Sequence, residues 1–124
     1  MAGPVAADPL EGTWKTGMDT GTSGLASSKA YVHVHIAPCG AALCGKMTRA
    51  FGFNGEYTSP NIGKTMLVDF VPDGKGAYAG TLWRPSNGKT YPATVRLKKN
   101  GKLQLKACIE GTPLCQKQTW KRVD

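Results

Sequence analysis

Three short turn signals recur at nearly regular intervals in the second half of the chain and limit the folds open to it. They are Pro72-Asp73-Gly74, Ser86-Asn87-Gly88 and Lys99-Asn100-Gly101. Asp-Gly and Asn-Gly tolerate the positive φ angles that tight β-hairpin turns require. The chain has neither a heptad run nor a 3.6-residue apolar stripe, so these signals predict short strands joined by hairpins.

The segment Lys29–Ile36 shows strand periodicity most clearly. Its apolar residues fall at every second position, which leaves Tyr31, His33 and His35 on the other face. The same reasoning predicts eight strands along the chain: Glu11–Thr16, Lys29–Ile36, Leu43–Phe51, Met66–Val71, Ala77–Arg84, Tyr91–Leu97, Leu103–Ile109 and Gln116–Val123. Gly, Ser, Thr, Asn and Pro are dense in Met18–Ser28 and in Phe51–Gly63, which are predicted to be loops without a regular element.

Eight strands joined mostly by hairpins form a meander, which removes its exposed edges by closing on itself. The predicted fold class is therefore all-β, a small antiparallel up-and-down barrel of about eight strands. A chain of 124 residues has room for one such domain. We expect it to span residues 10–124, after a flexible N-terminal segment at residues 1–9.

The four cysteines form two tight pairs in the sequence, Cys39 with Cys44 and Cys108 with Cys115. Four cysteines allow three disulfide pairings, of which this local one ranks first because each pair can meet across a turn. The alternative is a metal site, but spacings of four and six residues do not match the Cys-x-x-Cys knuckle of structural zinc. Disulfides of this kind indicate a secreted or periplasmic protein.

The length of the apolar runs bears on targeting. None approaches the roughly 20 residues of a membrane span or the roughly 7 to 15 residues of a signal-peptide core. We therefore expect a soluble chain from which the signal peptide is already absent.

The formal net charge is +8, from 16 basic and 8 acidic residues. This excess suits binding to anionic surfaces such as nucleic acid, lipopolysaccharide or phospholipid headgroups, and it also serves solubility. A basic stripe is predicted from Arg96, Lys98, Lys99, Lys102, Lys106, Lys117, Lys121 and Arg122. The stripe has no aromatic residue on which bases would stack. An anionic envelope surface is therefore favoured over nucleic acid as its partner.

Residues with metal-binding or catalytic chemistry are sparse. His33 and His35 would project from the same strand face and could chelate zinc or copper, but no third ligand lies nearby, so we predict no metal. The acidic residues Glu56, Asp69, Asp73 and Glu110 are scattered, and no nucleophile has a histidine and an acid beside it in a known motif. We therefore expect neither an enzyme nor a cofactor.

Four aromatic residues are the candidate ligand contacts. They lie in the long loop or near strand ends, where an aromatic body and a polar tip suit a pocket mouth: Tyr57, Tyr78, Trp83 and Tyr91. The alternative role for each is to fill the core of a small barrel.

Four spaced motifs resemble a family of small exported bacterial proteins, the domain-of-unknown-function 2147 family. They are Gly12-Thr13-Trp14, Leu43-Cys44-Gly45-Lys46, Pro85-Ser86-Asn87-Gly88-Lys89-Thr90-Tyr91 and Gln118-Thr119-Trp120-Lys121-Arg122-Val123. The resemblance runs from about Leu10 to Val123. It implies a lipocalin-like, or calycin, barrel with no assigned activity.

A second resemblance is to lipocalins, which carry Gly-x-Trp on the first strand and an arginine of the final strand packed over the indole. It implies that Gly12, Trp14 and Arg122 close one end of the barrel, through a cation–π contact of about 0.5–2 kcal/mol. The expected function is a non-enzymatic binding barrel for a small apolar or amphipathic ligand. The alternative is an envelope-associated module whose basic surface binds anionic polymers or lipid headgroups.

Overall fold

A computed structural model describes residues 9–16, 31–52, 55–74, 76–84, 88–109 and 114–123. Its strands are β1 (Gly12–Lys15), β2 (Tyr31–Cys39), β3 (Ala42–Gly52), β4 (Gly55–Tyr57), β5 (Thr65–Pro72), β6 (Tyr78–Arg84), β7 (Lys89–Leu97), β8 (Leu103–Cys108) and β9 (Cys115–Arg122). The predictions for residues 1–8 and for Met18–Ser28 fall outside the described residues. No helix among the described residues is long and apolar enough to cross a membrane.

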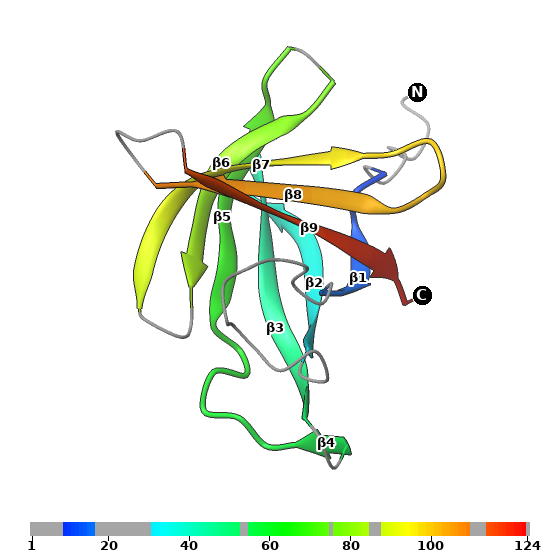
Figure 1. Cartoon of the computed structure of the whole chain (residues 1–124), viewed down its shortest axis with the longest axis vertical. Helices are drawn as coiled ribbons and strands as arrows, with labels where there is room; N and C mark the ends of the chain where they lie inside the picture. Colours follow the sequence, from blue (N-terminus) through cyan, green and yellow to red (C-terminus); the bar gives the residue numbers. More distant parts are fainter. Residues whose placement is uncertain are drawn as a thin grey trace.

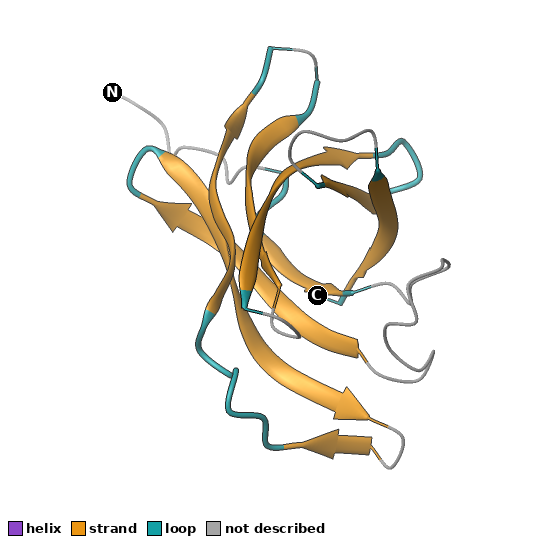
Figure 2. Cartoon of the chain, turned by 60° about the vertical axis from the view of Figure 1, so that its left-hand side comes forward, coloured by secondary structure: helices purple, strands orange, loops and turns teal. Residues whose placement is uncertain are grey.

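The sheet closes into an antiparallel barrel of eight strands (Figures 1 and 2). Each strand pairs with its neighbours in the order β1, β2, β3, β5, β6, β7, β8 and β9, and β9 then pairs with β1. β4 is not part of this ring, because it pairs only with the end of β3 and projects beyond the barrel (Figure 1). The predicted fold class is confirmed, since every barrel strand is antiparallel to both neighbours.

The glycine of each turn signal adopts the conformation that the sequence predicts, although Ser86 and Asn87 lie outside the described residues. The glycines at positions 74, 88 and 101 have φ angles of 80°, 71° and 82°, which only glycine adopts easily. The Asp73 side chain also accepts a hydrogen bond from the backbone N–H of Ala77, at 3.2 Å. These turns hold the register of the β5–β6, β6–β7 and β7–β8 hairpins.

Two expectations about element boundaries are wrong. Phe51–Gly63 is not free of regular structure, because β3 continues to Gly52 and Gly55–Tyr57 pairs with Ala50–Gly52. Gly55 has a φ of 102°, so the glycine-rich composition marks a tight hairpin there and not an irregular loop.

The second strand also passes its expected end at Ile36 and reaches Cys39 through Pro38. Pro38 is tolerated because β1 pairs with β2 only from His33 to Ile36, so no ladder partner needs an N–H from position 38 on that side. The other described strand boundaries agree with expectation or differ by at most two residues.

Inward side chains from every barrel strand fill the interior. The core consists of Leu10, Trp14, Val34, Ile36, Leu43, Met47, Leu67, Phe70, Leu82, Ala93, Val95, Leu103, Leu105 and Trp120. An eight-stranded barrel is just wide enough for side chains to meet across its axis. Trp14 and Trp120 are completely buried and supply the largest volumes. Most of the interior is therefore packed core.

A β-bulge in β5 brings both Leu67 and Phe70 into the core, although these residues are three positions apart. The pairing with β6 shifts between Val68 and Val71, and Asp69 takes a φ of 54°. Aspartate is among the few non-glycine residues that adopt this conformation readily. The bulge turns Phe70 inward, where strict alternation from Leu67 would place Asp69.

The two disulfides join Cys39 to Cys44 and Cys108 to Cys115. The first lies at the tip of the β2–β3 hairpin and the second where β8 ends and β9 begins. Because β2 and β8 run in opposite directions in the antiparallel ring, their last residues lie at opposite ends of the barrel, and only the second disulfide lies at the pocket end described below. The two disulfides pin hairpins at opposite ends of the barrel.

Candidate ligand-binding site

One end of the barrel is closed by a contact between its first and last strands. The guanidinium of Arg122 lies 4.3 Å from the ring centroid of Trp14 and donates hydrogen bonds to the carbonyl oxygens of Pro9 and Glu11, at 2.6 and 2.9 Å. The Trp14 indole N–H donates to the Leu10 carbonyl at 2.9 Å. These contacts tie the segment before β1 across the barrel and bury Leu10 beneath it.

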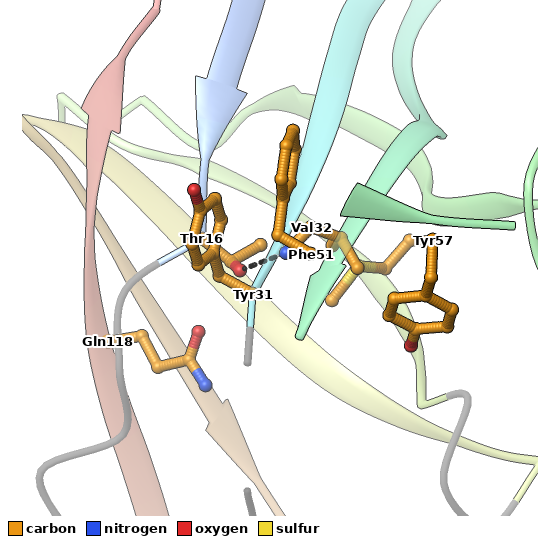
Figure 3. Close-up of a pocket in the computed structure, with 7 residues that line it drawn as sticks. Thr16, Tyr31, Val32, Phe51, Tyr57 and Gln118 are labelled. Atoms are coloured by element: carbon orange, nitrogen blue, oxygen red, sulfur yellow. Dashed lines mark hydrogen bonds between the residues drawn. The ribbon is translucent and has the colours of Figure 1, made fainter. Parts of the chain in front are cut away.

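The other end of the barrel holds a pocket of about 190 Å³ (Figure 3). Its walls come from the ends of β1, β2, β3 and β5, from β4 and from β9: Thr16, Tyr31, Val32, Phe51, Tyr57, Met66 and Gln118. It is smaller than the roughly 300–1,000 Å³ that drug-sized ligands occupy. It therefore suits a small molecule, or one end of a longer one.

The pocket combines apolar and hydrogen-bonding surfaces. Val32, Met66 and Phe51 supply hydrocarbon, whereas Tyr31 and Tyr57 supply hydroxyl groups. Thr16 fixes the wall at the β1–β2 junction, because its hydroxyl oxygen accepts the backbone N–H of Val32 at 3.0 Å (Figure 3). A surface of this kind matches an amphipathic molecule.

Gln118 has an orientation set by the core. The Trp120 indole N–H, which can only donate, lies 2.9 Å from the Gln118 side-chain oxygen. That hydrogen bond fixes the positions of the amide oxygen and nitrogen of Gln118. The two N–H groups of Nε2 are then left to donate to other acceptors. Since Gln118 also lines the pocket, the site presents a fixed pair of donors to an acceptor group on a ligand.

Aromatic rings stack at the rim of the pocket, on the ends of β2 and β3. The rings of Tyr31 and Phe51 have centroids 4.8 Å apart, and His33 lies 4.7 Å from Phe51. The ammonium group of Lys15 lies 4.3 Å from the centroid of Tyr31, which brings a positive charge to the rim. This stack holds Tyr31 and Phe51 against each other and so stabilises one wall.

The surroundings of His33 disfavour the protonated, positively charged form of its imidazole and so lower its pKa. Burial is the largest cause that lowers its pKa below the ordinary 6.5, followed by the charge of Arg49. Glu56 acts in the opposite direction, and Lys15 lowers the pKa further. Glu56 also pairs with Arg49 at 3.2 Å. The neutral imidazole is therefore favoured in the folded protein.

The structure does not bring the four candidate aromatics together. Tyr57 lines the pocket and is 54% exposed. Tyr78 and Trp83 are half-buried and pack against the core cluster, and the Lys64 ammonium lies 5.5 Å from the Trp83 ring. Tyr91 is half-buried and lies opposite Leu82. Only Tyr57 among them is part of this pocket.

Sequence reasoning missed Thr16, Val32 and Gln118 because it looked for aromatic side chains with a polar tip. The signal that finds them is periodicity: Thr16, Val32 and Gln118 each lie two positions from a buried core residue on the same strand face, namely Trp14, Val34 and Trp120. A residue that continues the inward face beyond the packed core must line the barrel mouth.

The described residues contain few groupings of metal-ligating or catalytic side chains. There, the only cluster of three metal-ligating types is Cys39, Cys44 and Asp69, and both of its cysteines are in a disulfide. The Nδ1 atom of His35 lies 3.1 Å from the Thr13 hydroxyl. Glu110 is outside the described residues, and Glu56 and Asp73 are engaged as described above.

The fold has a counterpart among solved structures. The chain is similar to a protein of the human pathogen Helicobacter pylori, HP1028, which is described as belonging to the lipocalin family. The TM-score is 0.67 at 18% sequence identity, over 93% of this chain and 83% of that chain. This likeness shows a lipocalin-like fold, and it does not indicate an enzymatic family. No curated protein sequence matches the chain.

A family model gives the relationship in sequence. The model for an uncharacterized protein conserved in bacteria, DUF2147, matches residues 12–122, which span all eight barrel strands. The match ends at Arg122, which pairs with Trp14 where β9 meets β1. Because the family model matches nearly the whole chain, the chain belongs to the DUF2147 family, and its fold is a lipocalin-like barrel.

Proposed function

We propose that this barrel binds a small amphipathic molecule in the pocket at its open end, outside the cytoplasm, without chemical conversion. The observation that carries the proposal is the Gln118 amide, which the buried Trp120 indole holds in one orientation beside an apolar wall. The amide donors suit a carboxylate, phosphate or carbonyl head group, and Val32 and Met66 suit a short hydrocarbon tail.

Charge, the disulfides and the packed interior support the nature of the ligand and its location. Lys15 at the rim and the net charge of +8 favour an anionic head group over a cationic one. Two disulfides support an extracytoplasmic location, because thiols in the cytosol are kept reduced. The packed interior below the pocket argues for a ligand held at the mouth and not along the barrel axis.

The test is a titration with sodium octanoate, followed by two-dimensional ¹H–¹⁵N NMR, with octylamine as the cationic counterpart. Octanoate should shift the Gln118 side-chain amide signals and the backbone signals of Thr16 and Val32, and octylamine should bind more weakly. Val32→Gln should weaken octanoate binding about tenfold, because it replaces apolar contact with a polar group.

The matched control is Val71→Gln, an equal substitution at an exposed position near the opposite end of β5. It should leave octanoate binding unchanged. A wild-type titration that fails to saturate, or that saturates with shifts confined to the Arg122 end of the barrel, would disprove the proposal.

A further inference from the structure

The outer face of four consecutive strands carries basic residues without acidic ones. β7, β8, β9 and β1 are adjacent in the barrel, and their sequences contain no aspartate or glutamate. Five basic side chains on them alternate with buried positions: Arg96, Lys106, Lys117, Lys121 and Lys15. We call these five residues the basic wall.

The strand register sets like charges against one another in the basic wall. Lys106 of β8 is directly opposite Lys117 of β9, and Lys121 of β9 is directly opposite Lys15 of β1. Arg96 is opposite Gln104, and hence diagonal to Lys106. Like charges in directly opposed positions destabilise a sheet, and solvated sheet faces usually mix the two signs.

No described carboxylate compensates these charges. None of the five residues is ion-paired with another described residue. Arg49 on β3, in contrast, pairs with Glu56 on β4. An uncompensated wall of this kind attracts an external anion with several charges, because each contact releases bound counterions and relieves the repulsion.

The shape and composition of the wall distinguish between anionic partners. The wall is one side of a closed barrel and is therefore convex, so a flat bilayer would touch only part of it. Its remaining outward positions on β8 and β9 include Gln104 and Thr119, so no large apolar side chain lies among the lysines to enter a membrane interface. The exposed apolar residues Ile109 and Leu114 lie beyond the strands, in the β8–β9 hairpin. A flexible polymer, in contrast, can follow a curved surface.

We propose that the basic wall binds a linear acidic polysaccharide, whose carboxylates or sulfates contact the lysines of β8, β9 and β1. The two disulfides favour a polymer found outside the cytoplasm over a nucleic acid. None of the five wall residues lines the pocket, but Lys15 also reaches the pocket rim, so the experiment substitutes only Lys106 and Lys117.

The experiment measures binding of the full chain to immobilised polygalacturonate, with neutral dextran and phosphatidylglycerol vesicles as comparison surfaces. Wild type should bind polygalacturonate, and the affinity should fall steeply between roughly 50 and roughly 300 mM salt. Lys106→Gln with Lys117→Gln should weaken this binding about fivefold, since two exposed charge contacts are lost.

The matched control is Lys46→Gln with Lys64→Gln, which removes the same charge from exposed lysines on β3 and before β5, across the barrel. This variant should bind within about twofold of wild type. Octanoate binding should be unchanged in both variants, which separates this proposal from the pocket. Equal losses in the two double variants, or tighter binding to the vesicles than to polygalacturonate, would overturn the proposal.

Discussion

Arg122, the last residue of β9, lies over the indole of Trp14 on β1, with the guanidinium carbon 4.3 Å from the ring centroid. The same guanidinium donates to two carbonyl oxygens of the segment before β1. One side chain therefore joins the chain's last strand, its first strand and the residues before them. The β1–β9 ladder that it supports is short, with only two residue pairs.

Replacing Arg122 should loosen this closure. Arg122→Ala should lower the free energy of unfolding by about 1–2 kcal/mol, because it removes a partly exposed cation–π contact and two hydrogen bonds. Arg122→Lys should lose about half of that, since a single ammonium group cannot reproduce the planar fork. Urea denaturation measures both. Lys121→Ala, at the neighbouring outward position, is the control; a loss equal to that of Arg122→Ala would contradict this role.

Gly80 should not accept a side chain. A Cβ atom at this position would lie 2.6 Å from Cδ1 of Phe70 and 2.8 Å from the carbonyl oxygen of Val68. Gly80→Ala should therefore destabilise the barrel by about 1–3 kcal/mol, because the buried Phe70 ring cannot move without disturbing the core. Thermal unfolding followed by circular dichroism measures the change.

A matched glycine controls for the general effect of Gly→Ala. At Gly52 the nearest atom to an added Cβ would be Cε1 of Tyr57 at 3.5 Å, an ordinary contact. Gly52→Ala should be tolerated within about 0.5 kcal/mol. Equal melting temperatures for the two variants would show that Phe70 does not restrict position 80.

His33 should make stability depend on pH. Its pKa is lowered in the folded protein, first by burial and then by Arg49, so the unfolded chain binds more protons in the range between the two pKa values. The free energy of unfolding should therefore fall as the pH drops from 6.5 toward the lowered pKa, and should be insensitive to this group above 6.5.

Denaturant unfolding across this range, with NMR titration of the imidazole, measures the effect. Arg49→Gln should raise the pKa of His33, because it removes the second-largest cause of the shift. His33→Gln should remove this part of the pH dependence. An imidazole that titrates in the folded protein above its unfolded value would contradict the assignment.

The disulfides should stabilise the barrel by similar amounts but at different ends. Each closes a short loop, with sequence separations of 5 and 7, so loop entropy predicts about 2 kcal/mol for each. Paired Cys→Ser variants of each disulfide, measured by denaturant unfolding, test the magnitude. Hydrogen exchange should show faster opening of the β2–β3 tip in one variant and of the β8–β9 tip in the other. Exchange that rises uniformly in both would contradict local pinning.

Local pattern accounts for most of the fold. Alternation around Val34, the Asn-Gly and Asp-Gly turns, and the short cysteine spacings each act over a few residues, so eight strands and their hairpins follow from the sequence. Composition was a poorer guide in Phe51–Gly63, where a three-residue strand pairs with the end of β3. So short a strand is stable only because it pairs with β3, and the composition of the segment itself gives no information about that pairing.

Most residues of the candidate site could not be predicted from local sequence patterns. The pocket unites Thr16, Tyr31, Phe51, Met66 and Gln118, which lie far apart along the chain. Of the four aromatic candidates, Tyr78 and Trp83 pack against the core, and Tyr91 lies on β7, away from the pocket. The basic residues were visible in the sequence, but the opposition of Lys106 with Lys117 and of Lys15 with Lys121 depends on register.

By itself, the sequence determined the strands, most of the turns and the all-β class, because each depends on short-range periodicity or on residue chemistry. Only the tertiary structure decided how the barrel closes and where its interior stays open. The bulge at Asp69 shifts which side chains face inward, and the β1–β9 pairing brings Trp14 to Arg122 from opposite ends of the chain. Such contacts carry no local signal, since they form only after every intervening strand has taken its place.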